Sequence, residues 1–254
     1  VVSIADFFLS EMLFRLRSKT LFRSKKMKSR NKIAPLILLV AITLLCVAVL
    51  GACNGNDNSS ADKETLTVGL ECGYIPFNFT QTTDANGAVK ISNADGYANG
   101  YDILIAKRIA DALGKELVIV KTEWDSLVPG IEAGTLDLVI AGMSPTAERR
   151  KTIDFSEAYY ESNLVIVVRK DGKYTEAKNL DDFNGAKLVA QQGTFHDDAL
   201  QEQASAHGIV AGTPMSTFPE MTIALNAKTI EGYVAEEPGA IADCAANKDL
   251  TYVH

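Results

Sequence analysis

Strand and helix patterns alternate along residues 66–142, and this alternation limits the fold more than any other feature of the chain. The segments are LTVGL (66–70), YDILIAKRIADALG (101–114), ELVIVK (116–121), SLVPGIEAG (126–134, a short helix that Asp125 would cap) and LDLVIAG (136–142). The first helix has apolar residues at helical spacing and ends on Gly114, as helices often do. Strand–helix–strand units of this kind form parallel sheets with right-handed crossovers. The polar stretch 81–100 is expected to be a loop or hairpin.

The alternation starts again after an extended segment. Predicted strands and helices are NLVIVVRK (163–170), LDDF (180–183), KLVAQ (187–191), 194–208, 218–228, EGYVAE (231–236), PGAIADCAAN (238–247) and LTYV (250–253). Two α/β units joined in this way predict an α/β protein with two lobes and a cleft between them. Ligands of open α/β sheets bind at the carboxyl ends of the strands, so the cleft is where a site is expected.

The N-terminal part has the layout of a secretory signal peptide, predicted here at residues 27–52. Basic residues follow Met27, and the eighteen residues Ile33–Leu50 carry no charge. Small residues then lead to Cys53, which resembles the lipidated cysteine of bacterial lipoproteins; two acyl chains would hold the protein on a membrane. The competing interpretation is a transmembrane helix, which needs about 20 apolar residues. Residues 53–64 are predicted to be a flexible tether, and residues 1–26 a misassigned extension.

Charge and cysteine content exclude several classes of function. Of the 25 Lys and Arg and 32 Asp and Glu, nine and two lie in residues 1–52, which leaves 16 basic and 30 acidic residues, a net charge of −14, in the rest. This charge argues against nucleic-acid binding and favours cationic or zwitterionic partners, although an acidic surface can also serve solubility alone. Beyond Cys46 and Cys53 only Cys72 and Cys244 remain, so neither a disulfide framework nor a metal or cofactor site is predicted. Two small buried thiols are expected, with a Cys72–Cys244 bridge as the alternative.

One candidate site follows the strand 136–142, where the sequence reads AGMSPTAERR (141–150). Ser144 or Thr146 can cap a following helix, whose free N–H groups would bind an anion. Arg149 can add a bidentate contact, and a carboxylate is the expected ligand. An ordinary capped helix with a surface Arg-Arg pair explains the stretch equally well.

Acidic and aromatic residues follow other predicted strands. Glu71 and Tyr74 come after 66–70, Trp124 after 116–121 and Glu236 at the end of 231–236. Two rings can enclose a ligand side chain, each contributing roughly 0.5–2 kcal/mol to binding a cation, and Glu236 can pair with an ammonium. The alternatives are rim or core aromatics and acids that favour a helix start. His196, Asp197 and Asp198 are consecutive and would diverge around a helix, so a metal or acid–base site is not expected there.

The motifs GYDILIAKRIA (100–110), LDLVIAGMSPTAERRKTIDFSEAYY (136–160) and AQQGT (190–194) make the chain similar to the extracytoplasmic solute-binding proteins of polar amino-acid ABC importers. The resemblance covers residues 65–254 and implies the two-lobed periplasmic-binding-protein fold of type II, closing like a hinge around one free amino acid. It implies lobes at 65–162 and 163–250, with 251–254 starting a crossing back into the first lobe. We therefore expect a C-terminal truncation that leaves the first lobe incomplete.

The resemblance also implies roles for individual residues. Arg149 would hold the α-carboxylate, with Ser144 and the backbone of Gly142 beside it and Thr194 closing on it from the second lobe. Ala141, next to Gly142, is also predicted to contact the ligand. Glu236 would take the α-ammonium, Tyr74 and Trp124 would enclose the side chain, and Glu71 would read its far end. Gln191, in the same AQQGT turn as Thr194, and Phe195, which follows that turn, are also predicted to contact the ligand. Two positions depart from the family pattern, because Glu71 stands for the more usual Asp and because Phe195 and His196 stand where smaller or amide residues are common.

The expected function is capture of a free amino acid outside the membrane and delivery to an ABC permease by a monomeric, lipid-anchored protein that is not an enzyme. A basic ligand (lysine, arginine, ornithine or histidine) is the first expectation, from Glu71 between two rings and the acidic body. Glutamine or another neutral polar amino acid is the alternative. A dehydratase on the same scaffold, with Glu71 or Glu236 as its acid, and an amino-acid sensor are the alternatives from other classes.

Overall fold

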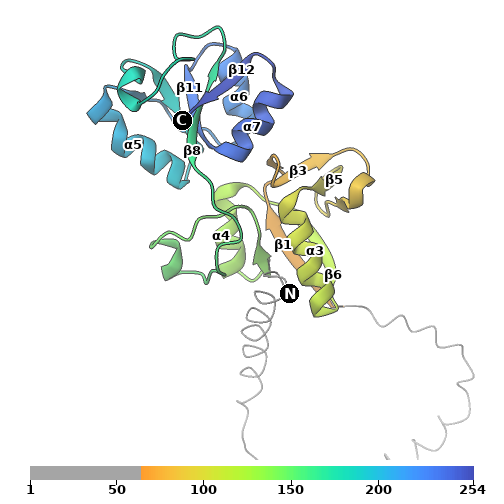
Figure 1. Ribbon diagram of the computed structural model, residues 1–254. Coiled ribbons are helices and arrows are strands. Elements are labelled where there is room, and N and C mark those ends of the chain that lie inside the picture. The colour runs from red at the N-terminus through yellow and green to blue at the C-terminus, as the bar shows by residue number, and fades with distance from the viewer. Residues whose placement is uncertain (1–63) are drawn as a thin grey trace, which may run out of the picture. The chain divides into compact units, whose positions relative to one another are not determined.

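The computed structural model describes residues 64–254. The predicted extension, the signal peptide, Cys53 and all of the tether but its last residue lie outside this range. Within the described residues, no helix is both long and apolar enough to span a membrane. Figure 1 shows these residues as two lobes joined through the segment that leads into β8.

The first lobe contains a three-stranded parallel sheet. Its elements are β1 (Thr65–Leu70), α3 (Tyr101–Leu113), β6 (Glu116–Lys121), α4 (Trp124–Glu132) and β7 (Leu138–Val139), and the strand order is β6–β1–β7. All six residues of β1 pair with β6, and Val68 lies opposite both Ile119 and Leu138. Val68 and Ile119 are fully buried, as expected of parallel strands that helices cover. The parallel α/β unit predicted from the alternation is confirmed.

A small antiparallel sheet adjoins this lobe and contains the polar stretch predicted as loop or hairpin. Its strands are β2 (Gly73–Tyr74), β3 (Asn78–Gln81), β4 (Val89–Lys90) and β5 (Tyr97–Asn99), with the short 3₁₀ helix η1 (Ala85–Gly87) between β3 and β4. They pair in the order β2–β3–β5–β4. β2 follows directly on β1, so this sheet places Tyr74 at the carboxyl end of the central parallel strand.

The second lobe is a five-stranded sheet in the order β10–β9–β11–β8–β12. Its elements are β8 (Leu164–Arg169), η3 (Leu180–Phe183), β9 (Lys187–Val189), α5 (Phe195–His207), β10 (Val210–Ala211), α6 (Phe218–Asn226), β11 (Gly232–Glu236), α7 (Glu237–Ala246) and β12 (Leu250–Val253). β8 is antiparallel to both β11 and β12, while β9 is parallel to β10 and β11.

Both faces of this sheet are buried, in two separate clusters. Val167 and Tyr233 belong to the cluster that includes residues of α6, whereas the next residues, Val168 and Val234, belong to the cluster that includes residues of α5. Successive side chains of a strand point to opposite faces, so one apolar run supplies both clusters. This explains why these strands read as continuous apolar segments in the sequence.

The helix ends follow local sequence signals. Gly114 ends α3 and Gly208 ends α5, both in the left-handed conformation that glycine adopts without strain. Thr217 and Glu220 form a reciprocal capping box at the start of α6.

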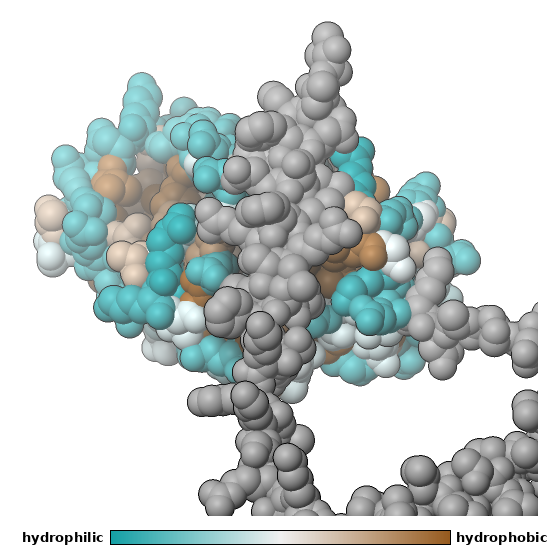
Figure 2. Space-filling model, turned by 90° about the horizontal axis from the view of Figure 1, so that it is seen from below, coloured by the Kyte–Doolittle hydropathy of each residue, from teal (hydrophilic) through white to brown (hydrophobic). Residues whose placement is uncertain are grey.

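Viewed from below, the face of the described part that Figure 2 exposes is mostly hydrophilic, with apolar patches in its hollows.

Four expectations need correction. The third strand is only Leu138–Val139, and no α-helix follows Gly142. The Ser144 carbonyl, which in a helix starting there would accept from the N–H four residues on, instead accepts from the Thr146 N–H and from the Arg149 guanidinium. A three-residue 3₁₀ helix, η2 (Arg149–Lys151), takes its place. Helix α4 begins at Trp124, so Asp125 lies in its first turn and not at the cap. Residues 251–253 pair with β8 and belong to the second-lobe sheet, where a crossing segment was expected.

Candidate functional site

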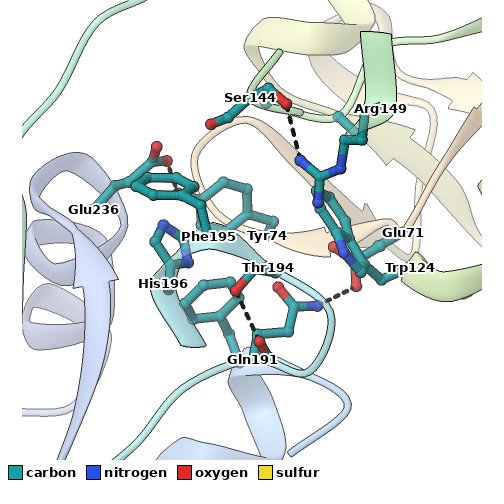
Figure 3. A pocket seen from close by; sticks show the side chains of 13 residues that line it. Glu71, Tyr74, Trp124, Ser144, Arg149, Gln191, Thr194, Phe195, His196 and Glu236 are labelled. Atoms are coloured by element: carbon teal, nitrogen blue, oxygen red, sulfur yellow. Dashed lines mark hydrogen bonds between the residues drawn. The ribbon is translucent and has the colours of Figure 1, made fainter. Parts of the chain in front are cut away.

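One cavity between the two lobes brings together all eleven residues predicted for ligand binding (Figure 3). Its lining is Glu71, Tyr74, Trp124, Ala141, Gly142, Ser144, Arg149, Gln191, Thr194, Phe195, His196, Phe218 and Glu236. The residues up to Arg149 come from the first lobe and the others from the second. The open volume is ≈ 20 Å³, which is room for about one water molecule. The lobes are therefore drawn closely together here.

Arg149 lies in the short η2 helix and points into the cavity. Its guanidinium donates to the carbonyl of Ser144 at 2.9 Å and, across the cleft, to the carbonyl of Gly193 at 2.9 Å. Thr146 Oγ1 accepts a hydrogen bond from the backbone N–H of Arg149 at 3.3 Å. Partial burial lowers the pKa of Arg149, yet an arginine remains charged throughout the physiological range. The expected helix N-terminus is absent here, so the positive charge at this position comes from Arg149 itself.

Trp124 lies under this guanidinium. The centre of the Arg149 guanidinium is 5.2 Å from the Trp124 ring centroid, within cation–π range. The indole N–H donates to the Gly193 carbonyl at 3.0 Å, so this one carbonyl of the second lobe accepts from two first-lobe side chains. The ring of Trp124 thus has a cationic partner within the protein.

Glu71 follows β1 and meets Gln191 of the second lobe. Gln191 Nε2 donates to Glu71 Oε1 at 2.6 Å and to the Ser216 carbonyl at 3.0 Å. Burial raises the pKa of Glu71 to about 7; the Gln191 hydrogen bond opposes this, while Glu123 and Asp125 add to it. A carboxyl group that titrates near neutrality lies at this end of the cavity, beside two further acids.

Tyr74 and Glu236 connect the lobes at the other end of the cavity. The Tyr74 hydroxyl donates to Glu236 Oε2, and burial raises the pKa of both groups. The Tyr74 ring stacks on Phe77 and Phe218, with centroids 5.1 and 4.7 Å away. Tyr74 and Trp124 therefore each already have aromatic or cationic partners, and they do not form an unobstructed pair of rings.

Gly142 is held by a network that the sequence did not suggest and that leads inward to buried Asp102. Its backbone N–H donates to the Tyr159 hydroxyl at 2.8 Å, and that hydroxyl donates to Asp102 Oδ1 at 3.0 Å. Asp102 also accepts from Asn78 Nδ2 at 2.8 Å, and burial raises the pKa of Asp102 to about 6. The Gly142 N–H was expected to face a ligand carboxylate; in the structure it has a protein acceptor instead.

Helix α5 begins directly behind the cavity. Thr194 caps it, accepting from the Asp197 N–H at 3.4 Å and donating to the Gln191 carbonyl at 2.7 Å. Gly193 precedes it with φ +68°, a left-handed conformation that favours glycine. Gln192, next to it, donates to Asp125 of the first lobe at 3.0 Å. The turn 191–194 therefore reaches across the cleft through side chains and backbone alike.

His196 and Phe218 also line the cavity, and the sequence interpretation assigned them no role there. His196 was placed on a diverging first helical turn, but it is only 5% exposed and packs against Phe195 and Phe218. Neither of its ring nitrogens has a hydrogen-bond partner within the described part of the chain. Burial, and to a smaller extent Arg149, lower the pKa of His196 to about 4. Its position two residues after the Gly-Thr turn was the one available signal.

A second, larger cavity of ≈ 290 Å³ lies behind Tyr74 and Phe218. Its remaining lining is Gly73, Ile75, Pro219, Thr222, Ile223, Gly239 and Asp243. Asp243 is the only charged residue among those of 64–254 that line it, and it accepts a hydrogen bond from the Tyr233 hydroxyl at 2.7 Å. Within this described range no cation lines the larger cavity, so the groups suited to a zwitterion lie in the smaller one.

The described residues contain no group of three metal-ligating side chains, and their two cysteines are not paired. Cys72 is buried, and burial raises its pKa to about 12; Cys244 is half-buried.

The chain is similar to known proteins both in sequence and in structure. Residues 66–235 match the family model of bacterial extracellular solute-binding proteins, family 3. A probable histidine-binding protein of Campylobacter jejuni is 30% identical over 213 residues, which are 80% of this chain and 77% of that protein. The arginine-binding extracellular protein ArtP of Bacillus subtilis is 30% identical over 172 residues, which are 68% of this chain and 61% of ArtP.

Solved structures share the fold. An amino-acid ABC transporter substrate-binding protein of Streptococcus pneumoniae, crystallised with L-arginine, superposes with a TM-score of 0.66 and 30% identity, over 75% of each chain. The chain spans less than two thirds of ArtP, so similarity alone does not assign the activity of ArtP to it.

Proposed function

This chain belongs to family 3 of the bacterial extracellular solute-binding proteins, and from that premise we propose that it captures one free amino acid with a cationic side chain. The observation that supports this most is the pairing of opposite charges across one cavity. Arg149 lines it from the first lobe and Glu236 from the second. A guanidinium suits the α-carboxylate and a carboxylate suits the α-ammonium, so the two lobes would grip the two ends of one zwitterion.

The acids at the other end support a cationic side chain. Glu71 lines the cavity, and Glu123 and Asp125 are close enough to influence its pKa. A ligand cation placed there would favour the ionised form of Glu71 and would gain from all three charges. The names of the arginine- and histidine-binding relatives agree with a basic ligand.

Binding would require the lobes to separate and close again. A volume of ≈ 20 Å³ cannot hold an amino acid. The groups that we assign to the ligand instead bond one another across the cleft, Gln191 with Glu71 and Arg149 with the Gly193 carbonyl. A ligand would replace these bonds with its own, so little hydrogen bonding is lost when it enters. Hinge closure around a ligand is the motion that this arrangement requires.

The test is calorimetric titration with each of the twenty amino acids and ornithine. We expect stoichiometric binding of arginine, lysine, ornithine or histidine. Absence of binding by every amino acid would remove the proposal, and tight binding of glutamine without any basic ligand would remove the choice of a cation.

A neutral polar ligand such as glutamine is the second candidate, and the pKa of Glu71 favours it. Because that pKa is raised to about 7, part of the Glu71 population is uncharged near neutrality and can donate a hydrogen bond to an amide oxygen. Titrating arginine and glutamine in parallel at pH 6 and pH 8 separates the two candidates.

The finer features of transport are also proposals. We expect Cys53, outside the described residues, to carry the lipid that holds a monomeric protein on the outer side of the cell membrane beside an ABC permease. Replacing Cys53 with alanine should release the protein from the membrane fraction. Uptake of labelled amino acid by cells lacking the gene, restored by the intact gene, would distinguish transport from sensing.

We further expect the ligand to leave chemically unchanged. The two cavity acids that could serve an enzyme, Glu71 and Glu236, are both assigned by this proposal to recognise positive charge. Recovery of the intact amino acid after incubation supports binding alone, whereas turnover of a cyclic acid substrate would point to the dehydratase alternative.

A further inference from the structure

We propose that His196 is a ligand-binding residue that donates a hydrogen bond to the α-carboxylate of the captured amino acid. This inference rests on the amino-acid binding proposed above and adds to it a residue that the sequence pattern did not assign. Three features of the imidazole support it: its location, its unused hydrogen-bonding groups and its charge state.

The location is the second-lobe wall of the cavity. His196 lies in the first turn of α5, two residues after Thr194, and in Figure 3 its ring lies between Glu236 and Thr194. Arg149 is the charged residue that influences it. An amino acid held by Arg149 at one end and Glu236 at the other would place its backbone groups against this ring.

The hydrogen-bonding groups of His196 are unused. Both ring nitrogens are buried and have no partner among the described residues, although a buried polar atom normally has one. Leaving such a group unpaired costs about 1–3 kcal/mol, so the site favours any ligand that supplies the missing partner. The rings of Phe195 and Phe218 hold the imidazole but offer it no hydrogen bond acceptor.

The charge state suits a zwitterion. His196 is neutral at physiological pH, because burial and Arg149 lower its pKa to about 4. A neutral imidazole carries one N–H donor and one acceptor nitrogen. The N–H can donate to the ligand carboxylate beside Arg149, and the other nitrogen can accept from the ligand ammonium beside Glu236. An imidazolium could only donate and would repel both Arg149 and the ammonium.

The variants His196→Phe and His196→Asn test this by calorimetry with the amino acid that the intact protein binds best. Phenylalanine keeps the ring packing and removes both polar atoms; we expect affinity to fall about ten- to hundredfold. Asparagine keeps a donor and an acceptor, so its affinity should stay within a few fold of the intact protein. His207→Phe is the matched control, since His207 ends the same helix and bonds Asp181 at 2.6 Å away from the cavity.

Thermal unfolding separates binding from packing. Without ligand, His196→Phe should melt at the same temperature as the intact protein or higher, because it removes two unpartnered buried atoms. Unchanged affinity in His196→Phe would overturn the inference while leaving amino-acid binding intact. If His196→Phe and His196→Asn lost affinity to the same extent and also melted at equally lowered temperatures, His196 would act through packing alone. That result would also overturn the inference. If the intact protein bound no amino acid, the proposed function itself would fail.

Discussion

Gln191 of the second lobe donates a hydrogen bond of 2.6 Å to Glu71 of the first, across 120 positions of sequence. Gln191 is itself held by the Ser216 carbonyl and is almost fully buried, so it fixes the orientation of the Glu71 carboxyl group, which lines the cavity. The orientation of this cavity acid therefore depends on a contact between the lobes as much as on the residues of its own lobe.

Replacing Glu71 with glutamine should change ligand preference. The amide retains an acceptor for Gln191 but carries no charge, so affinity for arginine should fall at least about tenfold while that for glutamine is retained or rises. Competition of unlabelled arginine and glutamine against a labelled ligand measures this. Glu123→Gln removes a nearby acid that does not line the cavity, and it should change the preference much less. Equal behaviour of the two variants would contradict the assigned role.

The raised pKa of Glu71 predicts a pH dependence of stability with a definite sign. Folded Glu71 keeps its proton up to about pH 7, whereas the unfolded chain loses it near 4.5. The folded state thus binds more protons between these values, so the contribution to stability is complete below pH 4.5 and is lost as pH rises through 7. Urea unfolding of the intact protein and Glu71→Gln should show the variant gaining relative stability over this range. A constant difference from pH 4.5 to 8 would show that Glu71 does not titrate as described.

Arg149→Ala should abolish tight binding. Arg149 is expected to make two charge-assisted hydrogen bonds to the carboxylate, each contributing roughly 1.5–3 kcal/mol, which corresponds to at least about a hundredfold loss in affinity. Arg150→Ala is the control, because Arg150 is the next residue but donates to the Pro145 carbonyl outside the cavity. Calorimetry of both variants suffices, and an Arg149→Ala protein that binds normally would refute the proposed grip on the zwitterion.

Much of this fold could be predicted from the sequence, because strands and helix ends depend on residues that lie close together in the chain. The strand 116–121 has the predicted limits, and α3 ends at Gly114 as expected, because period and capping are encoded within a few residues. The short third strand was overestimated, since an apolar run shows burial but not how many of its residues find a partner strand. Positions after predicted strands already indicated six of the eleven cavity residues, Glu71, Tyr74, Trp124, Ser144, Arg149 and Glu236. Family resemblance added the others, because it carries information on distant contacts that periodicity lacks.

What could not be predicted involves contacts between distant elements. His196 in a first helical turn looks like an exposed residue until Phe218 and the opposite lobe cover it. Likewise, the Gly142 N–H looked available until Tyr159 was found bonded to it.

Tyr159→Phe should lower stability by about 1 kcal/mol, because it removes the acceptor of the Gly142 N–H and one donor to buried Asp102. The Tyr159 side chain is 37% exposed, so water can replace part of what is lost. Tyr160→Phe removes a hydroxyl from the adjacent, half-exposed ring and should change stability by no more than about 0.5 kcal/mol. Chemical denaturation of both variants makes the comparison. Equal effects would mean that the Asp102–Tyr159–Gly142 network contributes nothing specific.

Gly193→Ala should weaken ligand binding as well as stability, and a second glycine allows the two effects to be separated. Gly193 has φ +68°, and a Cβ there would lie 2.5 Å from Asp125 Oδ1 of the opposite lobe. Gly185 has φ +78°, but a Cβ there would have nothing within 4 Å. Both substitutions incur the left-handed strain of about 1–2 kcal/mol.

Only Gly193→Ala would push on the first lobe and shift the carbonyl that Trp124 and Arg149 share. We therefore expect similar losses in unfolding free energy but a loss of affinity in Gly193→Ala alone; matching affinities would show that the cleft closes without this close approach.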